Sequence, residues 1–330
     1  MTLRSGGLTD ECPTQSFYSS RFFDDAMMPL QDMFRRISWL RYTMRYRDYF
    51  FNRFVRRWGL RAQGVAGSSG REDVTVIIGV KNRCDYRIVN ALKSLRCQDY
   101  DRQLIRIVLV DYDSSQEMIE KFREICARFD ARYLRLDNKP VWNKSHCLNI
   151  AIRQADTKYL MSSDVDVFFE KNYISACVRR LRDDPFQVLI SSFYNTPSGL
   201  VDGEIDVLGE YGAIKKLCGF QKTELGLNGA LNPGINFSLT RFYQHIRGYD
   251  EYYTLWGSED LDLIKRFALS GLKVTDISAN SSWIHQCHEK HEGVNAQQNF
   301  KEKIAQNKQY VLHTHTVERN DADWGIPEKK

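Results

Sequence analysis

Two aspartates separated by a single residue, Asp164 and Asp166, follow an apolar segment that has the composition of a buried strand. In an extended segment, side chains two residues apart point the same way, so both carboxylates would face one site. Two carboxylates at one site repel each other unless a cation lies between them. Oxygen ligands of this kind favour Mg²⁺ or Mn²⁺ held jointly with substrate phosphates. The simpler alternative is a pair of solvated acids in the loop after a strand.

A second group of acids, Glu259, Asp260 and Asp262, opens a predicted helix directly after Trp256 and Gly257. Acids in a first turn also stabilise the helix dipole, which is the plainer explanation of their position. The dipole does not explain the tryptophan. An indole face packs well on the C–H face of a sugar ring, while a carboxylate accepts a hydroxyl proton. The segment therefore indicates a carbohydrate site.

Three of the seven histidines in the chain fall within seven residues, at positions 285, 288 and 291. The spacing matches no standard zinc motif, because an HExxH arrangement is absent. A structural zinc site that uses Cys287 would lack a clear second pair of ligands. An imidazole from this segment, joined to the two aspartates, would instead complete a Mn²⁺ site.

A scaffold must bring these separate segments together, and the sequence from residue 74 onward predicts one. Apolar, β-branched runs predict strands at 74–80, 105–110, 132–136 and 158–162, and helical spacing predicts helices at 86–96, 116–129 and 145–154. This alternation is typical of a Rossmann-like α/β fold with a mostly parallel sheet and helices on both faces. Ligands bind beyond the carboxyl ends of such strands, which is where Asp111, Asp113 and the Asp164/Asp166 pair fall. Residues 186–240 are less regular, and residues 259–272 predict another helix.

The segment before this pattern, residues 1–70, has a different character. Apolar residues at helical spacing run from 29 to 58, and residues 35–57 hold eight arginines against one acid. The pattern predicts an amphipathic helix whose apolar face is covered by the α/β domain that follows, by a second copy of the chain in a homo-oligomer, or by an anionic membrane surface. The small residues at 64–70 read as a linker.

Composition limits the classes of protein to consider. The chain has 330 residues, of which 42% are hydrophobic, and a net charge of +5, which suits a globular protein with a sizeable core. We expect no transmembrane helix and no secretory signal, because no apolar run is long enough and the first residues hold no apolar stretch. The eight cysteines stand singly, which favours free thiols in a reducing compartment. We expect no nucleic-acid partner, because the excess of basic residues is confined to 35–57.

Several segments, taken in order, resemble a GT-A-fold glycosyltransferase of family 2, with a C-terminal half similar to galactosyltransferases and chondroitin polymerases. They are VTVIIGVKNR, VLVDYDSS, NKSHCLNIAI, YLMSSDVDVFF and GINFSLTRFYQHIRGYDEYYTLWGSEDLDL, followed by the histidines. The resemblance covers roughly residues 72–295. It implies a GT-A domain at 71–295, with a nucleotide-sugar half at 71–170 and an acceptor half at 171–295. Residues 1–70 would form an N-terminal helical extension and 296–330 a C-terminal helix and tail.

The resemblance also implies roles for individual residues. Asp260 would be the catalytic base, assisted by Glu259, which would bind the acceptor together with Trp256 and Gly257. The metal ion, Mn²⁺ or Mg²⁺, would be bound directly by Asp166 and His288. Asp164 would hold the ion through water or contact the ribose, and His285 would also be within reach of the ion. The residues expected to line the donor pocket are Gly79, Asn82, Arg83, Asp111, Asp113, Lys144, Asp164 and Val165.

The expected reaction is the inverting transfer of a hexose or N-acetylhexosamine from a UDP-sugar to a hydroxyl of a glycan or lipid-linked acceptor. The family pattern DDGS is replaced by Asp111-Tyr112-Asp113-Ser114, which leaves open which of these acids recognises the nucleobase of the donor. One alternative is a retaining N-acetylgalactosaminyltransferase-like enzyme, although such enzymes usually carry Asn where this chain has Asp260. Another is a non-catalytic carbohydrate-binding relative, although these tend to lose the acids that this chain keeps. We expect a cytoplasmic protein, peripheral on the inner face of the membrane if residues 29–58 bind lipid.

Overall fold

The computed structural model describes residues 70–223, 234–288, 300–314 and 316–328. The predicted amphipathic helix at 29–58 and the third clustered histidine, His291, lie outside the described residues.

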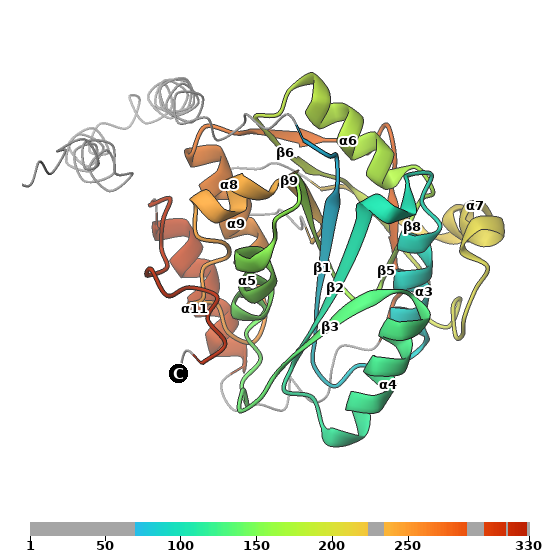
Figure 1. The fold of residues 1–330 in the computed structure, drawn as a ribbon, viewed down its shortest axis with the longest axis horizontal. Coiled ribbons are helices and arrows are strands. Elements are labelled where there is room, and N and C mark those ends of the chain that lie inside the picture. Colours follow the sequence, from blue (N-terminus) through green and yellow to red (C-terminus); the bar gives the residue numbers. More distant parts are fainter. Residues whose placement is uncertain (1–69, 224–233, 289–299, 315, 329–330) are drawn as a thin grey trace, which may run out of the picture.

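A seven-stranded sheet forms the centre of the described chain (Figure 1). Its strands are β1 (Val74–Val80), β2 (Ile105–Tyr112), β3 (Ala131–Leu136), β4 (Tyr159–Ser163), β6 (Gln187–Ile190), β9 (Asn236–Leu239) and β10 (Lys273–Asp276). The spatial order is β10-β6-β9-β4-β1-β2-β3. Strand β1 pairs in parallel with β2 and β4, β2 with β3, and β10 with β6, whereas β9 runs antiparallel between β4 and β6. The predicted mostly parallel sheet is therefore confirmed.

Helices cover both sides of the central strands, which explains why β1 and β2 are almost entirely buried apolar runs. Helices α5 (Lys144–Gln154), α8 (Thr240–His245), α9 (Glu259–Leu269) and α11 (Phe300–His313) lie on one side. Helices α3 (Tyr86–Arg96), α4 (Gln116–Arg128) and α7 (Val207–Leu217) lie on the other (Figure 1). The remaining helices are α6 (Tyr173–Asp183) and the short η1 (Arg102–Leu104). Within the described ranges, no helix combines the length and the apolar character that crossing a bilayer requires.

A second, smaller sheet is built from very short strands: β5 (Val167–Phe169), β7 (Phe193–Asn195), β8 (Gly219–Gln221) and β11 (Trp283–His285). Its order is β5-β11-β7-β8. Strand β11 lies antiparallel to β5 and parallel to β7. Residues 186–240, for which the sequence predicted less regular structure, thus supply strands to both sheets as well as α7.

The described C-terminal residues pack closely on the domain. Val317 and Trp324 are buried members of the main hydrophobic core. Beside them, Arg266 and Asp262 form a fully buried ion pair with 2.6 Å between Nε and Oδ2. Arg319 approaches the second oxygen of Asp262 at 3.0 Å. The sequence predicted a helix and tail at 296–330, and the described part of this segment contributes to the core.

Candidate active site

Polar side chains gather where the parallel strands end. Asn82 and Arg83 follow β1, Asp113 follows β2, and Asp164 and Asp166 follow β4. Because β1 lies between β2 and β4 in the sheet, these segments meet at one edge. The carboxyl edge of a parallel sheet is the usual ligand site in this class of fold.

One cluster at this edge contains Asp166, His285 and His288. Their nitrogen and oxygen ligand atoms all lie within 4.8 Å of one another. Asp166 Oδ2 is 3.0 Å from His288 Nε2 and 3.8 Å from His285 Nε2. The small sheet creates this proximity, because His285 in β11 pairs with Val167, the residue after Asp166.

The orientation of His285 is fixed by a residue that the sequence did not reveal. His285 pairs with Asn195 in the β11–β7 register, and its Nδ1 lies 2.7 Å from Asn195 Oδ1. The amide oxygen only accepts hydrogen bonds, so Nδ1 donates to Asn195 and Nε2 is turned towards Asp166. Asn195 lies ninety positions away in the chain. No local sequence signal connects the two residues.

This cluster has the chemistry of a metal site. Burial alone would raise the pKa of Asp166, but the neighbouring imidazoles of His285 and His288, together with the charge of Arg83, hold it well below its usual range. The carboxylate is therefore ionised. One carboxylate and two imidazoles suit a first-row transition metal ion such as Mn²⁺ better than Mg²⁺, which prefers oxygen ligands. The residues present thus fit the metal ion that the sequence led us to expect.

Asp164 has different partners from Asp166. Residues 165 and 166 form a turn rather than an extended segment, so the rule that places side chains two residues apart on the same side does not apply to this pair. Asp164 Oδ1 lies 2.8 Å from Lys144 Nζ. Val165, between them, is buried. In the described part of the chain, the group able to hold a metal ion is Asp166, His285 and His288, without Asp164.

A second cluster surrounds Lys144, the first residue of α5. Its ammonium lies 2.8 Å from Asp164, 3.0 Å from Asp260 and 3.6 Å from Glu259. Burial acts to lower the pKa of Lys144, but the three carboxylates raise it well above its ordinary value. One firmly charged ammonium therefore stands among three acids. The sequence predicted Lys144 near the diphosphate but not its place between the predicted base and Asp164.

Asp260, the predicted base, has the environment that such a role requires. Its Oδ1 accepts a hydrogen bond from the Tyr249 hydroxyl at 3.2 Å. Burial raises the pKa of Asp260 to about 7, opposed by the charge of Lys144. The neighbouring carboxylates of Glu259 and Asp164 reinforce the rise. A carboxyl group with a pKa near the working pH is well matched to general-base chemistry.

Trp256 stands exposed immediately before these acids. Its side chain is one of the most accessible large apolar groups of the described chain, at 60% exposure. Gly257 and Ser258 both have positive φ angles, 97° and 75°, and form the bend that leads into α9. Positive φ is easy for glycine, which explains Gly257 in this bend. An open indole next to a buried acid is the arrangement that the sequence predicted for a sugar site.

The predicted donor residues at the end of β2, Asp111 within the strand and Asp113 after it, differ in accessibility. Asp111 has no exposed surface, and its Oδ2 accepts hydrogen bonds from Tyr133 at 2.6 Å and Arg135 at 2.7 Å. Asp113 keeps 27% of its side chain exposed and accepts a hydrogen bond from the Lys139 amide at 2.9 Å. Asp113 is thus the more accessible acid. Arg135 was not identified from the sequence.

The predicted donor residues at the end of β1 and directly after it have clear structural roles. A Cβ at Gly79 would lie 2.9 Å from Cys147 Sγ, so glycine there permits α5 to pack on β1. Asn82 ties the loops after β1 and β2 together: its amide donates to Ser114 Oγ at 2.8 Å and its Oδ1 accepts from the Ser115 amide at 2.7 Å. The side chain of Arg83, by contrast, reaches the Asp166 cluster.

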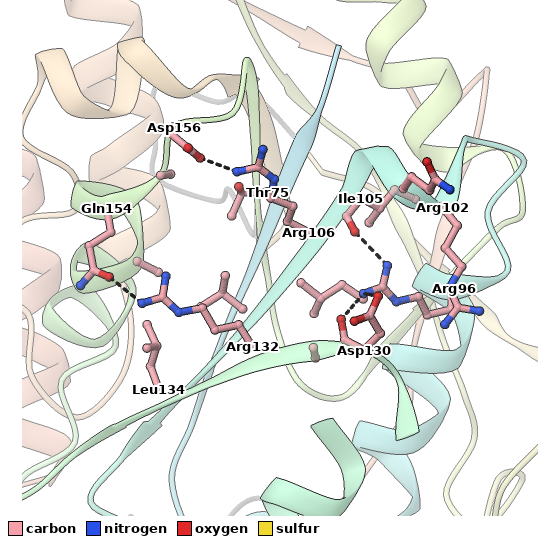
Figure 2. A pocket seen from close by; sticks show the side chains of 16 residues that line it. Thr75, Arg96, Arg102, Ile105, Arg106, Asp130, Arg132, Leu134, Gln154 and Asp156 are labelled. Carbon is pink, nitrogen blue, oxygen red and sulfur yellow. Dashed lines mark hydrogen bonds and ion pairs between the residues drawn. The ribbon is translucent and has the colours of Figure 1, made fainter. Parts of the chain in front are cut away.

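A surface groove of about 420 Å³ lies away from these clusters, at the amino ends of β1, β2 and β3 (Figure 2). Figure 2 shows that Arg96 and Arg106 are engaged with neighbours: Arg96 donates to the Ile105 carbonyl at 2.8 Å, and Arg106 donates to Asp156 at 2.6 Å. None of the predicted site residues lines the groove. We therefore place the chemistry at the opposite edge of the sheet.

Two known protein families match the chain. Residues 75–206 match the family described as Glycosyl transferase family 2, and residues 217–291 match the N-terminal domain of galactosyltransferase. The first match includes Lys144 and Asp166, and the second includes Asp260, His285 and His288. Both clusters therefore combine residues from the two matched segments. No curated protein sequence matches the chain.

Solved structures share the fold at low sequence identity. The 1–349 fragment of S. aureus TarS in complex with UDP-GlcNAc is 15% identical, with a TM-score of 0.52 over 73% of this chain and 67% of that one. GalNAc-T7 with UDP, GalNAc and Mn²⁺ is 16% identical, with a TM-score of 0.55 over 74% of this chain and 48% of that one. The match spans 40% of a longer TarS chain. These likenesses show the GT-A fold.

Proposed function

Since the chain carries a glycosyltransferase domain of the GT-A fold, we propose that it transfers a hexose or N-acetylhexosamine from a UDP-sugar to an acceptor hydroxyl. The transfer would depend on a divalent metal ion and would invert the configuration at the anomeric carbon. The observation that carries the proposal is the pairing of two clusters at one sheet edge. One holds ligands for a metal, and the other holds a buried base beside an exposed tryptophan. The acceptor is a glycan or a lipid-linked sugar.

The first cluster serves the nucleotide side of the reaction. Asp166, His285 and His288 would hold the metal ion, and we propose Mn²⁺ rather than Mg²⁺ because two of the three ligands are imidazole nitrogens, whereas Mg²⁺ prefers oxygen. When bound, such an ion supplies positive charge to the leaving diphosphate. GalNAc-T7, which shares the fold, has been crystallised with UDP and Mn²⁺. That neighbour and the TarS complex with UDP-GlcNAc support a UDP-sugar as the donor.

The second cluster serves the acceptor side. Trp256 would stack on the acceptor sugar, and Glu259 would accept a hydrogen bond from one of its hydroxyls. Asp260 would take the proton of the attacking hydroxyl as its oxygen bonds to the anomeric carbon and the bond to the diphosphate breaks. UDP then leaves from the opposite face. A single displacement of this kind inverts the anomeric configuration.

Titration of UDP into the protein tests the metal dependence. We expect tighter binding of UDP with Mn²⁺ than with EDTA, and we expect Asp166→Ala to abolish that difference because a metal ligand is lost. Asp164→Ala is the matched control, since Asp164 pairs with Lys144 and lies outside the metal group. Equal UDP affinity with and without metal in the unaltered protein would refute the metal dependence. A loss in Asp164→Ala equal to that in Asp166→Ala would refute the ligand set.

Substitution of the base tests the catalytic assignment. Asp260→Asn should keep UDP binding but slow transfer by a factor on the order of 10² to 10⁴, the usual contribution of a general base. Transfer is measured with a panel of UDP-sugars and glycan acceptors, and the anomeric configuration of the product is read by NMR. Near-normal turnover would show that Asp260 is not the base. A retained configuration would instead favour the N-acetylgalactosaminyltransferase-like alternative.

A further inference from the structure

Arg83 lies directly on the atoms that would bind the metal ion. Its guanidinium forms an ion pair with Asp166 Oδ2 through Nη1, and the same Nη1 is 3.2 Å from His288 Nε2. Only 9% of the Arg83 side chain is exposed. One nitrogen of Arg83 thus contacts ligand atoms of two of the three metal-binding residues.

The two ligand atoms also lie close to each other, since His288 Nε2 is 3.0 Å from Asp166 Oδ2. The positively charged guanidinium of Arg83 therefore stands against both atoms at once. A metal ion that binds the same two atoms must displace Arg83, because the atoms are shared and the two positive charges repel.

The surroundings of Arg83 determine the free-energy cost of displacing its guanidinium from Asp166. Burial lowers the pKa of Arg83, and the nearby charges that also affect this pKa are those of Asp166, Arg87 and Asp85. Asp85 is engaged by Arg87, whose Nε lies 3.0 Å from Asp85 Oδ1 and 3.1 Å from Oδ2. Asp166 is therefore the main anionic partner of Arg83. Leaving a buried guanidinium without its carboxylate is unfavourable unless another anion replaces it.

We propose that Arg83 competes with the metal ion for Asp166 and His288, so that metal binding is coupled to the arrival of a diphosphate that accepts the displaced guanidinium. The inference rests on the proposed metal dependence. Metal alone must break the Arg83–Asp166 pair without compensation. Metal together with the donor exchanges one anionic partner of Arg83 for another, so the two ligands favour each other's binding.

Measurement of Mn²⁺ binding by electron paramagnetic resonance, with and without saturating UDP, tests this coupling without any turnover. In the unaltered protein UDP should tighten Mn²⁺ binding by about tenfold or more, within the usual range of coupling between two sites. Arg83→Gln should bind Mn²⁺ alone about tenfold more tightly than the unaltered protein, and UDP should then add little. Arg83→Met is the second variant, used if the glutamine amide itself contacts Asp166 or if that variant does not fold.

Arg87→Gln is the matched control, because it removes the same charge nearby without removing a contact to Asp166. An equal gain in Mn²⁺ affinity in Arg87→Gln and Arg83→Gln would overturn the proposal, since the effect would then be one of overall charge. Unchanged Mn²⁺ affinity in Arg83→Gln and Arg83→Met, with UDP-dependent Mn²⁺ binding in the unaltered protein, would overturn the competition but leave the metal site standing. Absence of Mn²⁺ binding in every protein, with or without UDP, would overturn both.

Discussion

At the scale of single residues, the charges around Lys144 set the environment of the proposed base, Asp260. Its ammonium contacts Asp164 at 2.8 Å and Asp260 at 3.0 Å, and Glu259 lies at 3.6 Å. Burial raises the pKa of Asp260 to about 7, and Lys144 is the group that opposes the rise. The lysine therefore limits the rise in the pKa of Asp260, as a base that works near neutral pH would require.

The first prediction concerns pH. Because the base acts as the carboxylate, kcat should fall as the pH drops below about 7, to roughly a tenth of its plateau one unit lower. Lys144→Met should move this fall to higher pH, since loss of the ammonium lets the pKa of Asp260 rise further. Lys144→Arg keeps a charge and is the control. An unmoved pH profile of kcat in Lys144→Met would mean that Lys144 does not tune the base.

At the scale of elements, the small sheet decides which side chains meet. The register of β11 sets His285 beside Val167 on one side and Asn195 on the other. Metal-binding histidines depend on such a partner at the second ring nitrogen. The position of His285 therefore depends on the pairing of three strands that are each only three residues long.

The second prediction follows from this register. Asn195→Leu should weaken Mn²⁺ affinity by about 10- to 100-fold, because the acceptor that orients His285 is lost. Asn195→Asp restores an acceptor at the same place and should bind Mn²⁺ much more tightly than Asn195→Leu. Both affinities are measured in the presence of UDP. If the two variants behave alike, Asn195 does not act through the imidazole.

The sequence predicted the elements with long, regular patterns and missed the short ones. Strand β1 and helix α3 have the predicted bounds, because apolar runs and helical spacing depend on near neighbours. Strands β7 and β11 were not predicted, since three residues carry no period. The same limit applies to the site. Asp166 and Asp260 were found from local motifs, whereas Asn195 depends on a contact between distant segments.

At the scale of the whole molecule, the C-terminal residues are held to α9 by buried charge. Asp262, in the same helical turn as Asp260, pairs with Arg266 at 2.6 Å and lies 3.0 Å from Arg319. All three side chains are almost completely buried. The described C-terminal segment is thus linked to the helix that carries the proposed base.

The third prediction tests this link through stability. Asp262→Ala should reduce the free energy of unfolding by about 3–5 kcal/mol, because two buried guanidinium groups lose their shared carboxylate. Urea denaturation gives the value. Glu120→Ala, which removes an exposed ion pair with Arg123, should change it by less than about 1 kcal/mol. A similar small loss in Asp262→Ala would show that the buried charges contribute no more than surface ones.

The distribution of the two clusters along the chain has a consequence for biosynthesis. Each cluster joins a residue from before position 170 with residues from after position 255: Asp166 with His285 and His288, and Lys144 with Glu259 and Asp260. A ribosome makes the early residues first. The nascent chain therefore carries Asp166 and Lys144 well before the ribosome has made the partners of these two residues, which lie after position 255. A chain that ended just before β11 would hold Asp166, Lys144, Glu259 and Asp260, but neither histidine of the proposed metal site.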